Sequence, residues 1–293
     1  MTSHDETNGL LSTIVPVGNI GETLENLRNI RDLARKNKVR LILVIDDVNE
    51  EKFKKELESL ATKDSMVAIT SFQGRNPGGA RNHGLKLCKS PWVHFCDSDD
   101  VPNFESIMKL LKDVLPSQNY DAIVGNFVIF DVAKKSNANV FASRSRFGLF
   151  GVAGNPGIWR WIFRREVLNT IQFPDNRLGE DQVFLCRLLQ NNPMINLQLH
   201  SNIYTYIQGG PSQLVKKDDM GSLFDSLQHL QGLDLRKTKM EFKLTINYMY
   251  LRLCYTYLRL LSRARKLSAI RVGIGLILKM PYSPTNRSIK PWP

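Results

Sequence analysis

The sequence has few cysteines, and they follow none of the patterns that bind metal or build a disulfide framework. The four cysteines are Cys88, Cys96, Cys186 and Cys254. They form no C-x-x-C pair, and no histidine lies at metal-ligand spacing from any of them. This argues against a zinc module and against a small secreted fold held by disulfides. The N-terminus also lacks a basic segment followed by a long apolar run, so we expect no signal peptide and a cytoplasmic protein with reduced thiols.

Acidic residues are nearly absent from the last fifth of the chain. From Arg236 to the C-terminus there are thirteen Lys or Arg residues and a single acid, Glu241, whereas the preceding residues carry 27 of each sign. The net charge of +12 therefore lies entirely in this C-terminal region. A partner that is attracted by positive charge should be sought there.

The same region has no uninterrupted apolar run long enough to span a membrane, because Lys243, Arg252 and Arg259 interrupt its Leu- and Tyr-rich stretch. A basic and aromatic helix of this kind can lie on an anionic membrane surface, which predicts a peripheral protein on the cytoplasmic face. The alternative is a helix packed on the rest of the protein with a solvated basic face. No nucleic-acid-binding motif accompanies the charge, so no nucleic acid partner is expected.

The rest of the chain has no internal repeat, and short apolar runs alternate with helical patterns. The apolar runs of the first half are LSTIVPV, VRLILVIDD, MVAITSF, WVHFC and DAIVGNFVIF. The alternation predicts an α/β fold with a mostly parallel sheet that is flanked by helices. In such a sheet, ligands bind at the carboxyl ends of the strands. Two acidic clusters, one at Asp46 and Asp47 and one at residues 97–100, follow predicted strands directly.

The second half of the chain predicts a looser arrangement. Residues 134–157 are rich in Ser, Asn and Gly and predict a loop or a short hairpin. A helix is expected from Glu180, a strand from about Ile203, and further helices from about Met220. The glycine loop at residues 208–215 is either a lid that closes over a ligand or a simple turn.

The acidic cluster after WVHFC requires an explanation, because adjacent carboxylates repel one another. Asp97, Asp99 and Asp100 lie within four positions. Mg²⁺ and Mn²⁺ take carboxylate oxygens and keep positions open for phosphate, so an Asp-x-Asp at a strand end can bind such a cation. At the edge of a buried sheet the cation would also relieve the repulsion. The alternative is structural: Asp100 caps the next helix, with Pro102 in its first turn, and the other two carboxylates are solvated.

Two further clusters have both a chemical and a structural interpretation. In GGARNHG, small residues enter a helix, so backbone N–H groups and Arg81 could face a phosphate. Glycines at a helix start are also common without a ligand. Glu180 and Asp181 begin another helix, where acids complement the helix dipole. One of them could instead be a general base beside an acceptor hydroxyl.

Six of these features occur in order over residues 11–212. They are VPVGN, VIDD, GGARNHG, FCDSDD, a Trp followed by IFRREVL, and GED. This order resembles the GT-A-fold glycosyltransferases of family 2, which are inverting enzymes that use nucleotide sugars. The resemblance implies a Rossmann-like GT-A catalytic domain over residues 1–215, with a donor-binding half at about 11–130 and an acceptor half at about 131–215. A helical, basic region at 216–293 would follow it.

The resemblance implies that Pro16, Val17 and Asp47 hold the nucleotide base, usually uracil. Arg81 would lie beside the donor. Two departures from the family touch the same pocket: DDVNEEKF stands where the family has an Asp followed by Gly-Ser and another Asp, and Gly18 stands where an aromatic residue is common. They keep open the alternative of a degenerate nucleotide-sugar-binding or scaffold protein.

The acidic residues also receive roles from the resemblance. Asp97 and Asp99 would be the DxD pair, which binds Mn²⁺ or Mg²⁺, with Asp99 as the principal metal ligand. Asp181, next to Glu180, would be the general base that removes a proton from the acceptor.

The resulting prediction is a metal-dependent, inverting glycosyltransferase. It would move a sugar from a nucleotide donor, expected to be UDP-linked, to a hydroxyl of a glycan or lipid-linked acceptor in cell-surface polysaccharide biosynthesis. Trp159 or Trp161 would stack on the acceptor sugar. A sugar nucleotidyltransferase is an alternative, but that class has a glycine-rich loop with a basic residue after its first strand, which Gly18, Asn19 and Gly21 do not supply.

Overall fold

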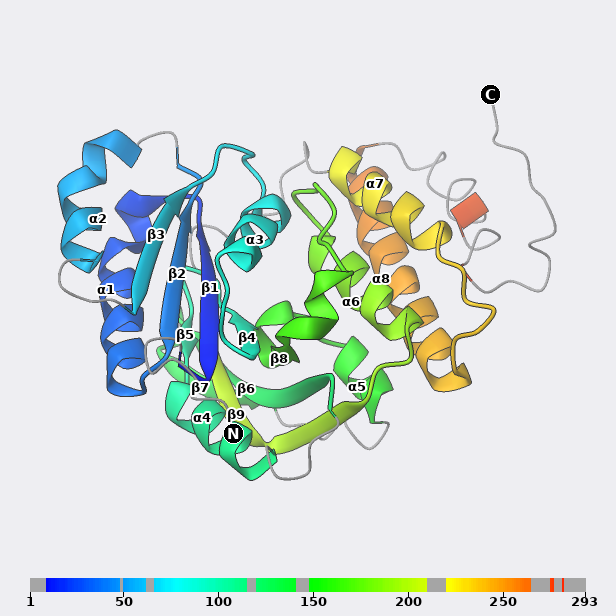
Figure 1. Ribbon diagram of the computed structural model, residues 1–293. Helices are drawn as coiled ribbons and strands as arrows, with labels where there is room; N and C mark the ends of the chain where they lie inside the picture. Colours follow the sequence, from blue (N-terminus) through cyan, green and yellow to red (C-terminus); the bar gives the residue numbers. More distant parts are fainter. Residues whose placement is uncertain are drawn as a thin grey trace.

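The computed structural model describes residues 9–47, 50–61, 66–114, 120–140, 148–209, 220–264, 275–276 and 281. A curved sheet runs through these residues, with helices on both faces (Figure 1). The strands are β1 (Leu11–Val17), β2 (Arg40–Ile45), β3 (Val67–Ser71), β4 (Trp92–Phe95), β5 (Val101–Pro102), β6 (Ala122–Asp131), β7 (Ser136–Val140), β8 (Trp161–Arg164) and β9 (Ile195–Gln208). Their order is β3-β2-β1-β4-β8-β6-β9-β5, and β7 forms a hairpin with β6.

The helices lie between and after these strands. They are α1 (Ile20–Lys36), α2 (Lys54–Ala61), α3 (Pro77–Lys86), α4 (Phe104–Val114), α5 (Leu149–Ala153), α6 (Glu180–Gln190), α7 (Met220–Gln231) and α8 (Met240–Ala264). Short 3₁₀ helices are η2 (Glu50–Phe53), η5 (Ile158–Arg160) and η6 (Arg165–Asn169). The predicted α/β class, with helices after the last strand, is therefore present.

The first four strands in the sheet order are parallel, which brings their carboxyl ends to one edge. β1 pairs with β2 and with β4, and β2 pairs with β3. Asp46 and Asp47 follow β2, and the acidic turn at residues 97–100 follows β4, so both clusters lie at this edge. Beyond β4 the sheet is mixed, because β8 is antiparallel to both β4 and β6. The expected parallel sheet therefore holds for β1 to β4, within the half predicted to bind a donor, and gives way to mixed pairing in the half predicted to bind an acceptor.

Alternating side chains of the strands fill two cores, one on each face of the sheet. In β1, Ile14 packs into the core beneath α3, α6 and α8, whereas Val15 packs into the core beneath α1, α2 and α4. Figure 1 shows α1 and α2 on one side of β1 to β3 and α3 on the other. In α1, Leu27, Ile30 and Ala34 are buried at helical spacing, and Asn19 caps the first turn by accepting from the Glu22 N–H at 3.3 Å.

The C-terminal helices α7 and α8 pack against α6 rather than forming a separate unit (Figure 1). Leu227 of α7 and Ile246 and Met249 of α8 share one core with Phe184 of α6. Packing on the rest of the protein, which is part of the second expected arrangement, is therefore found for the described helices. The predicted boundary at residue 215 and most of the proposed lid loop lie outside the described residues.

The outer face of α8 carries several exposed apolar side chains, and they are Met240, Leu244, Leu251 and Tyr255. In the part of the chain that the structure describes, no helix is both long enough and apolar enough to cross a bilayer. Contact with an anionic membrane surface stays a prediction, which flotation with liposomes can test.

Candidate active site

The acidic turn after β4 is held in place by β9. The Asp97 N–H donates to the Tyr204 hydroxyl at 3.0 Å, and this hydroxyl donates to Asp100 Oδ2 at 2.9 Å. The Ile207 N–H donates to Asp100 Oδ1 at 2.7 Å. Asp100 is 1% exposed, and its burial, reinforced by the charge of Asp97, raises its pKa to about 8. Tyr204 lies more than 100 residues away in sequence, and no local motif indicated its part in this turn.

The suggestion that Asp100 caps the following helix is wrong. Asn103 caps α4, because its Oδ1 accepts from the Ser106 N–H at 3.0 Å. Both carboxylate oxygens of Asp100 are directed to β9 instead, so Asp100 fixes the turn against that strand.

Arg81 of α3 joins three carboxylates from two distant parts of the chain. Its Nη2 donates to Asp97 Oδ1 at 2.9 Å, and its Nη1 donates to Glu180 Oε1 and Asp181 Oδ1, each at 2.9 Å. Arg81 is 3% exposed, and the three carboxylates raise its pKa above the ordinary value despite its burial. The guanidinium group therefore acts as the counterion of an acidic cluster. The expectation that Arg81 faces a donor phosphate is corrected accordingly.

The glycine-rich start of α3 is also closed to a phosphate. Asn76 caps this helix by accepting from the Gly79 N–H, and it donates to Asp175 Oδ1 at 2.6 Å. Asn82 exchanges two hydrogen bonds of 3.0 Å with the backbone of Phe173. A side chain at Gly78 would collide with the carbonyl oxygen of Pro174. GGARNHG therefore allows close packing between α3 and the segment that leads to α6, and it forms no phosphate cradle in this structure.

Glu180 and Asp181 begin α6 immediately after Gly179, which has a positive φ of 81°. The Asp181 side chain is 21% exposed and Glu180 is 10% exposed, so Asp181 is the more accessible acid. Asp181 Oδ2 also accepts from the Ile158 N–H at 3.3 Å. Burial raises the pKa of Asp181, although Arg81 opposes the shift. Burial and the neighbouring Asp181 raise the pKa of Glu180 to about 8.

Replacing Glu180 by Gln is expected to reduce the slope of the unfolding free energy with pH between the ordinary pKa of 4.5 and about 8. In this window the folded protein keeps a proton on Glu180 that the unfolded chain releases, so folding weakens as the pH rises, by up to about 1.4 kcal/mol per pH unit. Gln has no proton to release. Urea denaturation at a series of pH values measures the slope, with Glu105→Gln on the exposed face of α4 as the control. Parallel curves for Glu180→Gln and the unaltered chain would contradict this.

The residues expected around the nucleotide base lie at the carboxyl ends of β1 and β2. Pro16 pairs with Val44, and Val17 pairs with Ile45. The Val17 side chain is fully buried, so it offers no side-chain surface to a ligand. Asp47 Oδ2 accepts from the Ile20 N–H at the start of α1, at 2.7 Å. Base binding by Pro16, Val17 and Asp47 stays a prediction.

Both members of the expected DxD pair are partly exposed. Asp97 holds Arg81 through Oδ1, while its side chain is 32% exposed, and Asp99 is partly exposed. In the described ranges, no group of three or more His, Cys, Asp or Glu side chains is arranged to hold a metal ion. Two carboxylates fit a hard cation that takes its other ligands from a diphosphate. A metal at Asp99 and Asp97 therefore stays a prediction that the donor set allows.

The two tryptophans that were expected at the acceptor side are packed inside the protein. Trp161 is fully buried and stacks on Phe163 with 5.9 Å between ring centroids, so it cannot stack on a sugar. Trp159 is 8% exposed and stacks on Tyr204 at 4.6 Å and on Tyr206 at 5.6 Å. Both predictions are corrected, because these rings already contact aromatic side chains.

Tyr206 is the partly exposed member of this aromatic stack, and the sequence interpretation missed it. Burial, and after it the charges of the three acids in the turn after β4, raise the pKa of Tyr206 to about 12. Tyr204 and Tyr206 are two positions apart in β9, so their side chains lie on the same face of the strand. This spacing is the sequence signal that could have indicated the pair.

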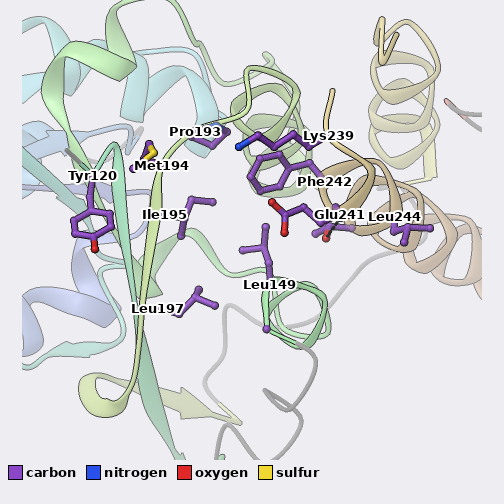
Figure 2. A pocket seen from close by; sticks show the side chains of 12 residues that line it. Tyr120, Leu149, Pro193, Met194, Ile195, Leu197, Lys239, Glu241, Phe242 and Leu244 are labelled. Carbon is purple, nitrogen blue, oxygen red and sulfur yellow. Dashed lines mark hydrogen bonds between the residues drawn. The ribbon is translucent and has the colours of Figure 1, made fainter. Parts of the chain in front are cut away.

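A pocket of about 550 Å³ lies elsewhere, between the start of β9, α5 and the start of α8 (Figure 2). Ile195 in the wall of the pocket pairs with Ala122, the first residue of β6. Strands β4 and β6 run in the same direction, because both are antiparallel to β8. The start of β6 therefore lies at the same edge of the sheet as the start of β4. The pocket is therefore at the edge of the sheet where β4 begins, away from the acidic turn. It is lined by Tyr120, Gly148, Leu149, Pro193, Met194, Ile195, Leu197, Lys239, Glu241, Phe242, Leu244 and Thr245.

Comparison with protein families gives a match over more than half of the chain. The family described as Glycosyl transferase family 2 matches residues 12–171. This range contains the acidic turn and Arg81, and it ends before Asp181.

Individual relatives extend the similarity beyond that range. Glycosyltransferase GlyG of Streptococcus pneumoniae is 22% identical over 80% of this chain and 85% of the relative. Poly(ribitol-phosphate) beta-N-acetylglucosaminyltransferase TarP of Staphylococcus aureus is 23% identical over 82% of this chain and 71% of the relative. The crystal structure of S. aureus TarS 1-349 in complex with UDP-GlcNAc has a TM-score of 0.66 at 19% identity, covering 92% of this chain and 81% of that one. At this identity, the likeness to TarS shows the fold.

Proposed function

The chain belongs to glycosyltransferase family 2, and from this membership we propose that it is an inverting enzyme that transfers a sugar from a UDP-linked donor to a hydroxyl of a cell-surface glycan or its lipid-linked precursor. The name of TarP and the UDP-GlcNAc complex of TarS support this choice of donor and acceptor. The observation that carries the proposal is the Arg81 cluster. It brings Asp97, at the strand end where a donor is expected, next to Asp181, a carboxylate that can act as a base.

In the proposed reaction, Asp181 removes the proton from an acceptor hydroxyl. The acceptor oxygen then forms a bond to the anomeric carbon from the face opposite the nucleoside diphosphate, whose bond to that carbon breaks. This single displacement inverts the anomeric centre. Arg81 holds Asp181 and Asp97 on its two Nη atoms, which positions the base relative to the donor side.

Asp99 and Asp97 would hold a Mn²⁺ or Mg²⁺ ion, which when bound would balance the negative charge that develops on the leaving diphosphate. Asp181 is set apart from this pair by Arg81, and its raised pKa makes it a stronger proton acceptor than an ordinary aspartate.

Binding of nucleoside diphosphates with and without Mn²⁺ tests the proposal. We expect UDP with Mn²⁺ to stabilise the chain by about 2.7 kcal/mol at a hundredfold excess over Kd, measured as a shift in Tm. Asp99→Ala should lose the part of this shift that depends on Mn²⁺, whereas the exposed control Glu105→Ala should keep it. Absence of stabilisation by any nucleoside diphosphate would overturn the proposal. Stabilisation without turnover of any sugar nucleotide would favour the degenerate binding protein instead.

A further inference from the structure

Two arginines from different elements hold the loop that precedes η5. Arg160 Nη1 donates to the carbonyl oxygen of Asn155 at 3.4 Å. Arg252 of α8 donates through Nη1 to the carbonyl oxygen of Gly154, the adjacent residue. The two guanidinium groups therefore bond to adjacent carbonyl groups of one short loop. In sequence, the two arginines are almost a third of the chain apart.

Neither guanidinium group has an acidic partner among the described residues. Arg160 is 4% exposed, and its Nε and Nη2 both donate to the carbonyl oxygen of Gly125, at 3.1 and 3.0 Å. Burial lowers the pKa of Arg160 to about 10, with no carboxylate opposing the shift. Arg252 is partly buried, and its Nε is a buried donor without a partner within the described ranges.

Arg81 provides the contrast, because its equally buried guanidinium group is matched by three carboxylates. A buried cation is costly unless an anion is paired with it. Carbonyl oxygens satisfy hydrogen bonds of Arg160 and Arg252 but supply no net negative charge. Two guanidinium groups at one place, with no carboxylate partner among the residues that the structure describes, therefore point to an anion that binds there.

The loop that they hold leads directly to the proposed base. Four residues after Gly154, the Ile158 N–H donates to Asp181 Oδ2. Asp181 accepts from this loop through Oδ2 and from Arg81 through Oδ1, and Arg81 in turn holds Asp97, at the strand end where a donor is expected. An anion at Arg160 and Arg252 would thus lie on the acceptor side of the site.

We propose that Arg160 and Arg252, with the loop at residues 154–158, form a subsite for a phosphate or carboxylate group of the acceptor. This inference rests on the proposed glycosyltransferase function and narrows its acceptor to an anionic polymer or an anionic lipid-linked glycan. The subsite fixes the acceptor by its charge, so that a neighbouring hydroxyl of the same molecule reaches Asp181.

Inorganic phosphate is the probe that tests the subsite. Its affinity is measured by calorimetry on the full chain saturated with UDP and Mn²⁺, so that the donor side is occupied, with acetate in a parallel series. Arg252→Gln is expected to weaken phosphate binding by at least about tenfold, the effect of losing one charge-assisted contact. Arg252→Lys should lose part of the affinity. The matched control is Arg259→Gln, an exposed arginine two turns further along α8. Stronger binding of phosphate than of acetate would indicate a phosphate-bearing acceptor, and the reverse order a carboxylate.

Two outcomes would overturn the proposal. One is phosphate affinity that is equal in Arg252→Gln, Arg259→Gln and the unaltered chain. The other concerns Asp218 and Asp219, which lie outside the described residues. If replacing both by Asn tightened phosphate binding at least tenfold, an acid of the chain would be the partner of Arg252. Failure of the glycosyltransferase proposal is recognised separately, as absence of UDP binding to the unaltered chain.

Discussion

Replacing Asp181 by Asn is expected to lower the rate of sugar transfer by about two to four orders of magnitude, the usual contribution of a positioned general base. The amide cannot accept the proton of the acceptor hydroxyl. It keeps the size of the side chain, and its oxygen can still accept from Arg81 or from the Ile158 N–H. The loss should therefore fall on kcat, while the affinity for UDP with Mn²⁺ stays within about threefold.

The rate is measured as release of nucleoside diphosphate from a panel of sugar nucleotides, with and without glycan acceptors. Glu166→Gln, an exposed acid in η6, is the matched control and should retain full activity. A kcat for Asp181→Asn within threefold of the unaltered enzyme would remove Asp181 from the role of base. If Glu180→Gln alone lost activity to the same extent, the base would be Glu180.

Replacing Arg81 by Met is expected to lower the free energy of unfolding by about 3–5 kcal/mol, the cost of leaving buried charges without a partner. Asp97, Glu180 and Asp181 would lose the guanidinium group with which all three form ion pairs. Met fills much of the same space, and the contact of Arg81 with the Phe173 ring, at 5.4 Å, is one that a thioether can replace in part.

The pH dependence separates lost charge from lost packing in this variant. Without Arg81 the three carboxylates are protonated more readily in the folded state, so the destabilisation should be largest near pH 8 and should shrink towards pH 5. Urea denaturation followed by tryptophan fluorescence measures both values. Arg28→Met on the exposed face of α1 is the control and should change stability by less than about 0.5 kcal/mol. An equal loss at pH 5 and pH 8 would show that packing, and not charge, is what Arg81 contributes.

The Arg81 cluster also connects the half of the chain that is predicted to bind the donor to the half that is predicted to bind the acceptor. Asn76, Arg81 and Asn82 of the α3 region each bond across to residues 173–181. Any displacement of α3 relative to α6 would break an ion pair as well as hydrogen bonds. A rigid connection of this kind keeps a base at a constant distance from a donor, which is the condition for a single displacement.

The sequence by itself predicted the strands and helices of the first half and the edge of the sheet where the acids gather. It did not predict β8, which lies between β4 and β6 in the sheet, and it began the last strand at Ile203 whereas β9 begins at Ile195. LSTIVPV and VRLILVIDD are short apolar runs that can be recognised from neighbouring residues alone. Because the two strands are parallel, their carboxyl ends lie at the same edge of the sheet. The order of motifs also predicted the family, because each motif is a contiguous stretch. It could not report what each acid contacts, since Arg81 and Asp181 are 100 residues apart and nothing local encodes their ion pair.

Only the tertiary structure decided which candidate residues face a ligand. The side chain of Trp161 suits a sugar, but packing buries it against Phe163. The side chain of Arg81 suits a phosphate, but three carboxylates of the protein surround it. That Arg160 and Arg252 have no acidic partner in the described part of the chain became visible only when their neighbours in space were known. Residue type and local pattern determine which interactions a side chain can make. Burial and neighbours that are distant in sequence determine which of them it does make. The reason is that electrostatic free energy depends on the distance between charges and on their exposure to solvent, and not on their separation in sequence.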